Sequence, residues 1–466
     1  MELVIKNGKV VMPGGVFEAN VAVMNGKIVS LGKTELKADK IVDAGGKLVL
    51  PGLIDSHSHI AQPFQGALPK ETWETGSVSA AFGGITTVID FAAQFDPITY
   101  EKLGVMGDIK RKEEIAGKQS VIDFAFHGIF VDFSDMNAVL REMEEVVKYG
   151  YPSFKEFMTY LLLAISDWNL YLMLNKSREV GATVGVHAEN YSLEEGMVKK
   201  FVEEGKKEPK YHPLSKPNLV EAEAIQRAII LAEWAKSRIY IAHMSTKEGV
   251  ELVRNARMRG AAIYAETCPQ YLTLTDDLYE RPDGANFIIS PPLRKKEDNE
   301  ALWRALAEGY VALYGSDHVP LPSEAKMAAK SFNETPNGAP GNELMLPILY
   351  SEGVNKGRIT LPRLVEVSSL NASKLFGLYP KKGLIAPGFD ADIVILDHKL
   401  KRKVRLEDLH MDIDYVNWEG WELTGWPTMV ISRGTLVIEE GQLVGKPGHG
   451  KPVRGKTDEE IIKTVR

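Results

Sequence analysis

The first 51 residues have the hydrophobic pattern of a small β domain. Short runs rich in valine and isoleucine alternate with polar positions, as in strands that are buried on one face. Asn7-Gly8 and Asn25-Gly26 stand between such runs and are typical of two-residue hairpin turns. We therefore predict strands and hairpins in residues 1–51.

The same pattern returns near the other end of the chain. Residues 391–397 and 428–445 are again valine-rich runs, and glycines separate the strands of the second segment. We expect the two ends to pair in one small β-sandwich domain, built from residues 1–51 and 381–445. Residues 446–466 are rich in glycine, proline and charge, which favours an extended C-terminal tail that reaches a neighbouring subunit.

Residues 52–380 alternate between short apolar runs and stretches with helical spacing. Residues 221–236 illustrate the helices, because small and apolar side chains recur there every three or four positions. Buried strands separated by helices predict a parallel sheet, and eight of them fit a (β/α)8 TIM barrel. The eight runs, each ending in polar residues, are LVLPGLIDSHSH, TTVIDF, VIDFAFHGIF, YPSFKEFM, ATVGVHAEN, RIYIAHMS, AAIYAETC and YVALYGSDH.

Composition narrows the function classes. The chain of 466 residues is 44% hydrophobic and 26% charged, with a formal net charge of -7, so we expect no nucleic-acid partner. No apolar run reaches the ~18 residues that would cross a membrane. The first residues lack the pattern of a signal or transit peptide. The single cysteine, Cys268, excludes a disulfide framework within the chain and fits a buried apolar position, so we expect a cytoplasmic protein.

Three polar residues end the first strand of the predicted barrel. Asp55, His57 and His59 occupy alternating positions, which would direct all three side chains to one face of a strand. Imidazole nitrogen is a good ligand for zinc and similar divalent ions. Asp55 would either orient a ligand or lie beside the metal itself.

His187, His243 and Asp317 each close a different predicted strand. In a barrel, reactive groups gather where the strands feed the loops at the C-terminal rim. Together with His57 and His59, these residues therefore predict a metal site at that rim.

Lys155 follows an apolar run and has Phe154 and Phe157 beside it. A desolvated lysine loses its proton easily, and the neutral amine can capture carbon dioxide to form an anionic carbamate that bridges two metal ions. Residue chemistry alone favours a lysine that reaches solvent or pairs with a carboxylate.

Longer motifs carry a resemblance to a known family. PGLIDSHSH, AAFGGITTVIDF, SFKEFMTY, VHAEN, ETCPQYL, SPPLR, GSDH, PNGAPGNE and ASKLFGLYPKKGLIAPGFDADIVI stand in order along nearly the whole chain. In these motifs the sequence resembles the hydantoinases and dihydropyrimidinases of the amidohydrolase superfamily. The resemblance implies hydrolysis of the cyclic amide bond of hydantoins or dihydropyrimidines to N-carbamoyl amino acids.

The resemblance also implies a metal centre with two divalent ions. His57, His59 and Asp317 would bind the more buried ion, and His187 and His243 the second. Lys155, carboxylated by carbon dioxide, would bridge the two ions. Zinc is expected, with manganese or cobalt as alternatives.

Catalytic and substrate-binding roles follow from the same resemblance. Asp317 would relay a proton to the leaving nitrogen, and the Tyr160 phenol would stabilise the oxyanion. The backbone of Ser290 and Asn337 would bind the cyclic ureide or imide. Members of the family are commonly homotetramers, so we expect a tetramer or dimer.

Some positions depart from the family pattern at the substrate mouth. Leu161 follows Tyr160, Val319 follows GSDH, and Gln62 and Gln65 lie in the loop after the first strand. These departures leave the ring substituent and the enantiomer open.

Three alternatives remain at this stage. A dihydroorotase would carry arginine where Ala61 stands, and an allantoinase generally lacks the equivalent of Tyr160. Allantoinase is therefore the nearer alternative. A non-catalytic scaffold of the same fold is more remote, because such relatives have lost metal ligands that this chain keeps.

Overall fold

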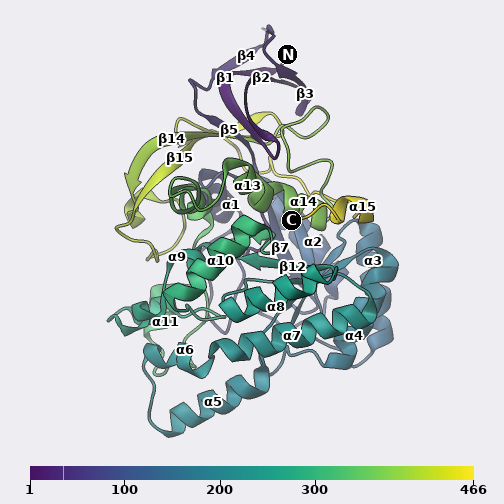
Figure 1. Cartoon of the computed structure of the whole chain (residues 1–466), viewed down its shortest axis with the longest axis vertical. Coiled ribbons are helices and arrows are strands. Elements are labelled where there is room, and N and C mark those ends of the chain that lie inside the picture. The colour runs from purple at the N-terminus through teal and green to yellow at the C-terminus, as the bar shows by residue number, and fades with distance from the viewer. Residues whose placement is uncertain (35) are drawn as a thin grey trace.

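Two sheets organise the protein. The structure is a computed structural model that describes residues 1–34 and 36–466. An eight-stranded parallel sheet curls into a barrel surrounded by helices, and a nine-stranded sheet forms a smaller domain at the top of Figure 1. The fold class predicted from the sequence is thereby confirmed.

The barrel strands follow one another in chain order. Each predicted apolar run forms one of them, and adjacent strands pair in parallel. Bonds between the chain after the first strand and the chain after the last close the ring, with His59 N–H donating to His318 O at 2.9 Å and Asp317 N–H donating to His57 O at 2.9 Å. The strands are β6 (Leu53–Asp55), β7 (Ile85–Ala93), β8 (Asp123–Ile129), β9 (Ser153–Phe157), β10 (Thr183–His187), β11 (Ile239–Ile241), β12 (Ile263–Thr267) and β13 (Leu313–Tyr314).

Helices cover the outside of the barrel. Most of residues 221–236 lie in α7, where the residues that recur at helical spacing are at most 1% exposed. These residues are Ala224, Ile225, Ala228, Ile229 and Ala232. The helices between the strands are α1 (Trp73–Phe82), α2 (Val105–Gln119), α3 (Met136–Tyr149), α4 (Asp167–Val180), α5 (Tyr191–Glu203), α6 (His212–Ser215), α7 (Asn218–Ala235), α8 (Lys247–Met258), α9 (Pro269–Thr273) and α10 (Lys296–Glu308). Those after β13 are α11 (Ser323–Met327), α12 (Met345–Ile348), α13 (Leu361–Val365), α14 (Asn371–Leu375) and α15 (Glu459–Ile462).

Local sequence signals set the ends of these helices. In α4, the Ser166 side chain accepts from Asn169 N–H and so caps the first turn. Gly181 ends the same helix in the left-handed region at a φ of 75°, where a side chain would be strained. Gly181 thus ends α4 two residues before β10 begins at Thr183.

The small domain joins the two ends of the chain, as predicted. β14 pairs antiparallel with β5, with Val394 opposite Leu50 and Ile395 opposite Val49. Its strands are β1 (Leu3–Met12), β2 (Gly15–Met24), β3 (Lys27–Gly32), β4 (Lys40–Asp43), β5 (Leu48–Pro51), β14 (Ile393–Lys403), β15 (Glu422–Ser432), β16 (Thr435–Glu439) and β17 (Gln442–Leu443).

One hairpin prediction was right and the other was wrong. Asn25-Gly26 lies between β2 and β3, as expected. Asn7-Gly8 instead lies inside β1, where the pairing with β2 shifts register and Asn7 has a φ of 57°. This is a bulge. The strand continues through it because Val10 and Val11 still pair with β2 and bury their side chains.

The C-terminal tail packs on the barrel of its own chain rather than extending away from it. Val453 N–H donates to Phe124 O at 2.8 Å, beside the N-terminal end of β8. The side chains of Val453, Ile462 and Val465 are buried. Burial of these apolar groups explains why a charged and glycine-rich segment adopts one position.

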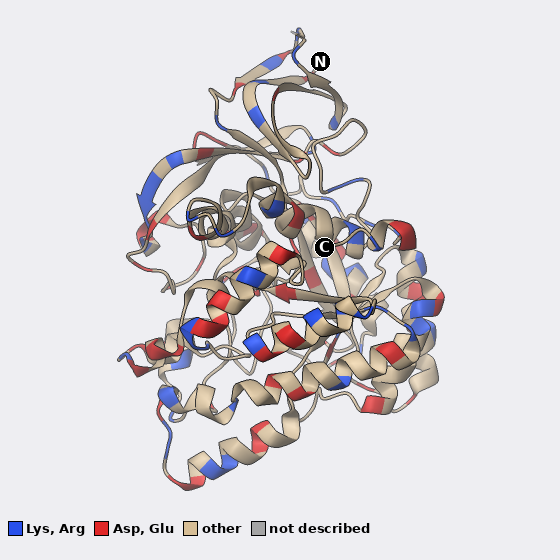
Figure 2. Cartoon of the chain, viewed as in Figure 1, with Lys and Arg blue, Asp and Glu red and all other residues tan. Residues whose placement is uncertain are grey.

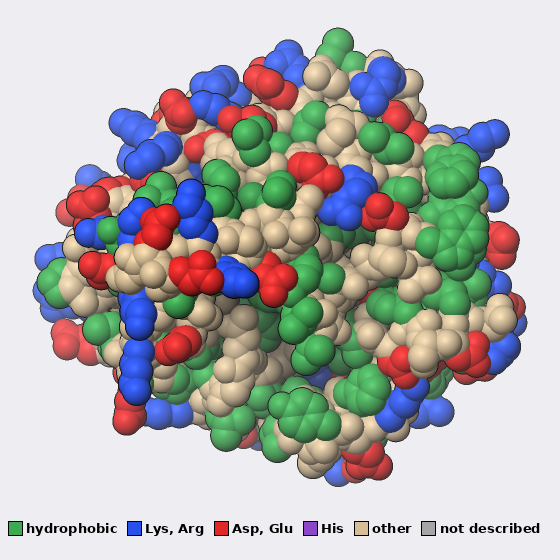
Figure 3. All heavy atoms as spheres, turned by 90° about the horizontal axis from the view of Figure 1, so that it is seen from below, with side chains coloured by type: hydrophobic (Ala, Val, Ile, Leu, Met, Phe, Trp, Pro, Cys, Tyr) green, Lys and Arg blue, Asp and Glu red, His purple; other side chains and the backbone are tan. Residues whose placement is uncertain are grey.

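Charges of both signs are distributed over the surface. Figure 2 shows lysine, arginine, aspartate and glutamate interspersed along the outer helices. On the face seen in Figure 3, hydrophobic side chains gather around a central hollow and along one edge, with both charges between them. Among the described residues, no helix is both long and apolar enough to span a membrane.

Candidate metal centre

One cavity at the C-terminal rim of the barrel collects every residue that the sequence singled out as a ligand, catalytic group or substrate contact. These residues come from the ends of five of the eight strands and from two loops, one before β13 and one after it, and the fold brings them together. The cavity is lined by His57, His59, Phe64, Lys155, Phe157, Tyr160, His187, His243, Ile289, Ser290, Asp317, Val319, Asn337 and Gly338.

Two histidines and an aspartate converge in this cavity. His57 Nε2 lies 3.3 Å from Asp317 Oδ1, and His59 Nε2 lies 3.6 Å from the same oxygen. The three ligand atoms lie within 4.8 Å of one another. Two imidazole nitrogens and a carboxylate oxygen at such separations can surround one divalent ion.

The first strand is shorter than predicted, and Asp55 does not join this group. β6 ends at Asp55, so His57 and His59 lie in the chain that follows it. Asp55 instead accepts from Ser316 N–H at 2.9 Å and from His57 N–H at 3.2 Å. Of the two roles open from the sequence, Asp55 therefore has the orienting one.

Asp317 is ionised in spite of its burial. Burial alone would raise the pKa of this carboxyl, but nearby His57 and a hydrogen bond from His59 outweigh it and hold the pKa well below its usual range. The carboxylate form is the one that binds a metal or accepts a proton.

A second pair of imidazoles lies beside the first. The rings of His187 and His243 are 4.4 Å apart between centroids, and the His57 ring lies 5.1 Å from that of His243. Burial lowers the pKa of both, and nearby cationic groups including Lys155 lower it further. Neutral imidazole is the form that binds a metal.

The hydrogen bonds of His187 and His243 leave one ring nitrogen of each histidine available to bind a metal ion. His187 Nε2 is 2.6 Å from Glu189 Oε2, so its Nδ1 is left for a ligand. His243 Nδ1 is buried and has no hydrogen-bond partner among the described residues. An orphaned buried nitrogen costs free energy unless something else, such as a metal ion, occupies it.

Lys155 lines the same cavity as the two groups of histidines. Its side chain is about 1% exposed, and Nζ is 4.6 Å from the centre of the Phe157 ring. Because the side chain is buried, Lys155 does not reach solvent. Within the described parts of the chain, no carboxylate oxygen comes within 4.0 Å of Nζ, so Lys155 forms no ion pair there. Burial lowers its pKa to about 8, which makes the reactive neutral amine accessible near neutral pH.

Three of the candidate residues have left-handed backbone. The φ angles are 65° at Tyr160, 36° at His243 and 50° at Asp317. Residues other than glycine avoid this region, at a cost on the order of 1–3 kcal/mol each. Such strain at three positions around one cavity is typical of a functional site.

Tyr160, Ser290 and Asn337 lie on the substrate side of the cavity. The Tyr160 ring contacts that of His187 edge-on, with the centroids 5.4 Å apart. The backbone N–H of Asn337 already donates to Gln65 Oε1 at 2.8 Å, so Gln65 competes with any ligand for that donor. Leu161 is 70% exposed and lies outside the cavity wall.

The sequence did not single out Glu266 or Lys326, although both support the site. Lys326 is fully buried and donates to Ile288 O at 2.8 Å and to Gly338 O, which ties together two of the segments that line the cavity. Burial lowers its pKa to about 7. Lys326 lies in α11, a helix of five residues that is too short to show a hydrophobic repeat, so no sequence pattern marks it.

Glu266 supports both groups of histidines. Its Oε1 is 2.8 Å from His57 Nδ1 and accepts from His243 N–H at 3.3 Å, and its Oε2 accepts from Ser56 Oγ at 2.7 Å. The sequence pattern could have identified Glu266 as a site residue, because it is a polar residue at the end of a barrel strand, as His187 is.

We expect Glu266→Gln to weaken metal binding by about 10- to 100-fold, because the charge that orients His57 is lost. Metal titration of the apoprotein measures this. Glu343→Gln is the matched control, since buried Glu343 Oε1 pairs with His410 Nδ1 at 2.8 Å outside the cavity lining. Equal affinities for Glu266→Gln and wild type would show that Glu266 does not orient a ligand.

Comparison with known proteins identifies a family and similar enzymes that match nearly the whole chain. Residues 48–437 match the amidohydrolase family model. The chain is 40% identical to a D-hydantoinase of Geobacillus stearothermophilus, with 99% of this chain and 100% of that protein covered.

Solved structures agree over the same length. A dihydropyrimidinase from Brevibacillus agri NCHU1002 superposes with a TM-score of 0.94 at 38% identity, covering 98% of this chain and 100% of that one. An L-hydantoinase (dihydropyrimidinase) from Arthrobacter aurescens superposes with a TM-score of 0.90 at 35% identity, covering 97% and 99%.

Proposed function

Because this chain belongs to the amidohydrolase family and is a cyclic-amide hydrolase of the hydantoinase and dihydropyrimidinase type, we propose that its cavity holds two divalent ions and opens a cyclic ureide or imide. The product is the N-carbamoyl amino acid. One observation carries the assignment of the site: His57 Nε2 and His59 Nε2 both approach Asp317 Oδ1. The same cavity is lined by buried Lys155, which forms no ion pair with any described residue, and by the imidazoles of His187 and His243, whose pKa values are lowered by burial.

We assign the ligands from this arrangement. As the family resemblance implies, His57, His59 and Asp317 would hold the more buried ion, and His187 and His243 would hold the other. Lys155 would react as the neutral amine with carbon dioxide and release a proton, and the carbamate so formed would supply anionic oxygen ligands to the metal centre. Zinc suits this set of nitrogen and oxygen ligands, and manganese or cobalt could replace it. When bound, the ions polarise the substrate carbonyl and lower the pKa of water to roughly 7.

Protein groups carry out the remaining chemistry. Asp317 accepts the proton of the attacking water and delivers it to the ring nitrogen that leaves, so that a C–O bond forms as the C–N bond breaks. The Tyr160 hydroxyl donates to the carbonyl oxygen as negative charge develops there. The backbone at Ser290 and Asn337 holds the ring, and binding at Asn337 N–H displaces Gln65.

The relatives favour this reaction over the alternatives. Those described above are hydantoinases and a dihydropyrimidinase, which agrees with the presence of Tyr160 and gives no support to allantoinase. They include both a D- and an L-enzyme, so we propose the reaction without a preferred enantiomer. The clustered ligands argue against a non-catalytic scaffold.

Ring opening of a small panel tests the proposal. Metal-replete protein is assayed on dihydrouracil, hydantoin, a 5-aryl hydantoin, allantoin and dihydroorotate, with product formation followed by chromatography. We expect turnover of dihydrouracil or of the hydantoins, with allantoin and dihydroorotate inert. Turnover of allantoin alone would contradict the substrate class.

We also propose that the protein is a homotetramer or homodimer in the cytoplasm. The assembly follows from the family resemblance, and the free buried Cys268 fits a reducing compartment. Analytical ultracentrifugation at working concentration should give a species of two or four chains. A single-chain species would contradict the assembly.

A further inference from the structure

Lys216 is a buried cation that no step of the proposed reaction uses. It directly follows α6, and its side chain is 4% exposed. Its Nζ lies 2.7 Å from Glu194 Oε1 and 3.5 Å from Glu189 Oε2, and it also donates to Ser290 Oγ. A buried lysine is retained only where such partners compensate for its lost hydration.

Each partner of Lys216 either lines the candidate site or contacts a residue in or next to it. Glu189 Oε2 is 2.6 Å from His187 Nε2 and accepts from Ser290 Oγ at 3.1 Å. Glu194 Oε2 accepts from Thr159 Oγ1 at 2.6 Å, and Thr159 directly precedes Tyr160. One ammonium group therefore connects the segment of His187, the turn that carries Tyr160 and the segment of Ser290.

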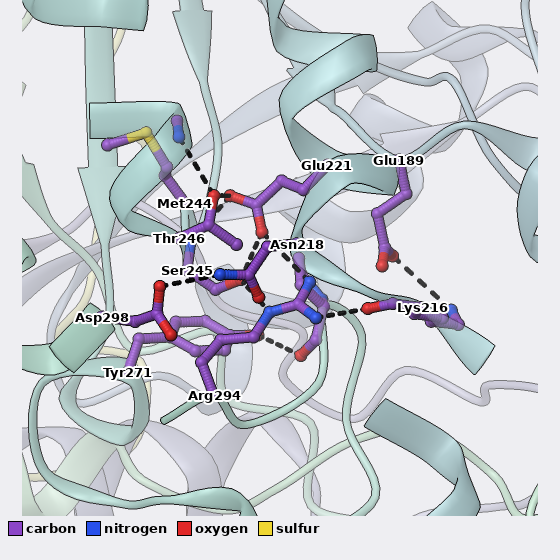
Figure 4. A network of polar contacts seen from close by, with 12 residues as sticks. Glu189, Lys216, Asn218, Glu221, Met244, Ser245, Thr246, Tyr271, Arg294 and Asp298 are labelled. Atoms are coloured by element: carbon purple, nitrogen blue, oxygen red, sulfur yellow. Dashed lines mark hydrogen bonds and ion pairs between the residues drawn. The ribbon is translucent and has the colours of Figure 1, made fainter. Parts of the chain in front are cut away.

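The backbone of Lys216 is fixed as firmly as its side chain. Arg294 donates to Lys216 O and, through Nε, to Ser245 Oγ at 3.0 Å. Glu221 accepts from Ser245 N–H at 2.9 Å and pairs with Arg294 at 3.4 Å. Figure 4 shows Arg294 between Glu221 and Lys216, with the Glu189 carboxylate directed at the lysine. This network joins Lys216 to the chain two residues after His243.

Lys216 also lies near the phenol ring. Nζ is 5.7 Å from the centre of the Tyr160 ring. The backbone of Tyr160 is strained, so the surrounding contacts must hold the turn in place. The contacts from Lys216 through Glu194 to Thr159 supply such a restraint directly beside the strained residue.

We propose that Lys216 is a positioning residue of the ring-opening reaction: it holds the Thr159-Tyr160 turn against Ser290 and Glu189 and so places the Tyr160 hydroxyl at the substrate carbonyl. This inference rests on the proposed function, in which Tyr160 stabilises the oxyanion. A small displacement of such a donor is costly, because its hydrogen bond must form where the charge develops.

A double-mutant cycle tests the proposal. Values of kcat and KM for hydantoin are measured for wild type, Lys216→Met, Tyr160→Phe and the double variant. We expect Lys216→Met to lower kcat roughly 30- to 100-fold while KM rises less than about 5-fold. In the Tyr160→Phe background the same change should cost less than about 3-fold, because the group that it positions is already absent. Lys216→Arg, which keeps the charge, should recover kcat to within about 10-fold of wild type.

The matched control is Lys382→Met, which removes another buried lysine. Lys382 Nζ lies 2.6 Å from both Asp123 and Asp392, where the barrel meets the small domain, so its loss should lower Tm and leave kcat unchanged. If Lys216→Met does not fold, Lys216→Met/Glu194→Gln removes both charges of that pair and enters the same cycle.

Outcomes separate this inference from the proposed function. No turnover by metal-replete wild type, or full activity of Tyr160→Phe, would overturn the proposed chemistry and with it the role of Lys216. An active wild type, an impaired Tyr160→Phe and an equal loss from Lys216→Met in both backgrounds would overturn the positioning role alone.

Discussion

Lys155→Ala should lose bound metal and reduce hydantoin hydrolysis on the order of 10⁴-fold, as removal of a central catalytic group does in other hydrolases. Lys155 is the one residue that we assign to both ions, and it lies buried in the cavity that both groups of histidines line. Without its carbamate, one carboxylate would be the only anionic ligand among those we assign to the two divalent cations. Metal analysis of the purified variant, alongside kcat on hydantoin, measures both effects.

The fold itself should survive this change. In the metal-free protein burial destabilises the ammonium form of Lys155, and its removal breaks no ion pair with the described residues. Thermal unfolding of the two apoproteins checks this, with Lys382→Met as a variant that should lose stability and keep metal. A Lys155→Ala protein with normal metal content and full activity would rule out the bridging role.

Asp317→Asn should reduce kcat by about 10³- to 10⁴-fold, a loss in the range seen when a triad member is removed from a hydrolase. The amide keeps an oxygen near His57 and His59 but can neither balance the metal charge nor accept the proton of the attacking water. Because the native carboxyl has a strongly lowered pKa, it stays ionised across the working pH range. The variant therefore differs from wild type at every pH at which the enzyme is active.

Steady-state kinetics on metal-saturated protein measures this loss. Asp392→Asn is the control, since Asp392 is also a buried aspartate but pairs with Lys382 away from the cavity. It should change Tm and leave kcat near wild type. If Asp317→Asn retained more than a tenth of wild-type kcat, the proton relay would belong to another group.

Much of this architecture could be predicted from the sequence because its signals are local. In the sequence, a barrel strand is an apolar run that ends in polar residues. In α7, the side chains of the buried face recur every three or four positions. The sequence located the candidate ligands at the barrel rim for the same reason, since His187 closes its strand and His243 and Asp317 follow theirs by two or three residues. Position at the rim of a barrel is itself a chemical signal.

The features that escaped prediction depend on contacts between distant segments. Lys216 follows a four-residue helix, and its importance arises only where Glu194, Glu189 and Ser290 meet around it. The Asn7-Gly8 prediction failed because turn chemistry cannot distinguish a hairpin from a bulge in a strand that continues.

Metal content followed together with activity tests the central claim most directly. Protein stripped by a chelator is titrated with zinc in the presence of bicarbonate, while bound zinc per chain and hydantoin hydrolysis are both measured. We predict that activity is absent in the stripped protein and reaches its maximum as the second ion per chain binds. Full activity in the metal-free chain, or with a single ion bound, would contradict the two-metal account.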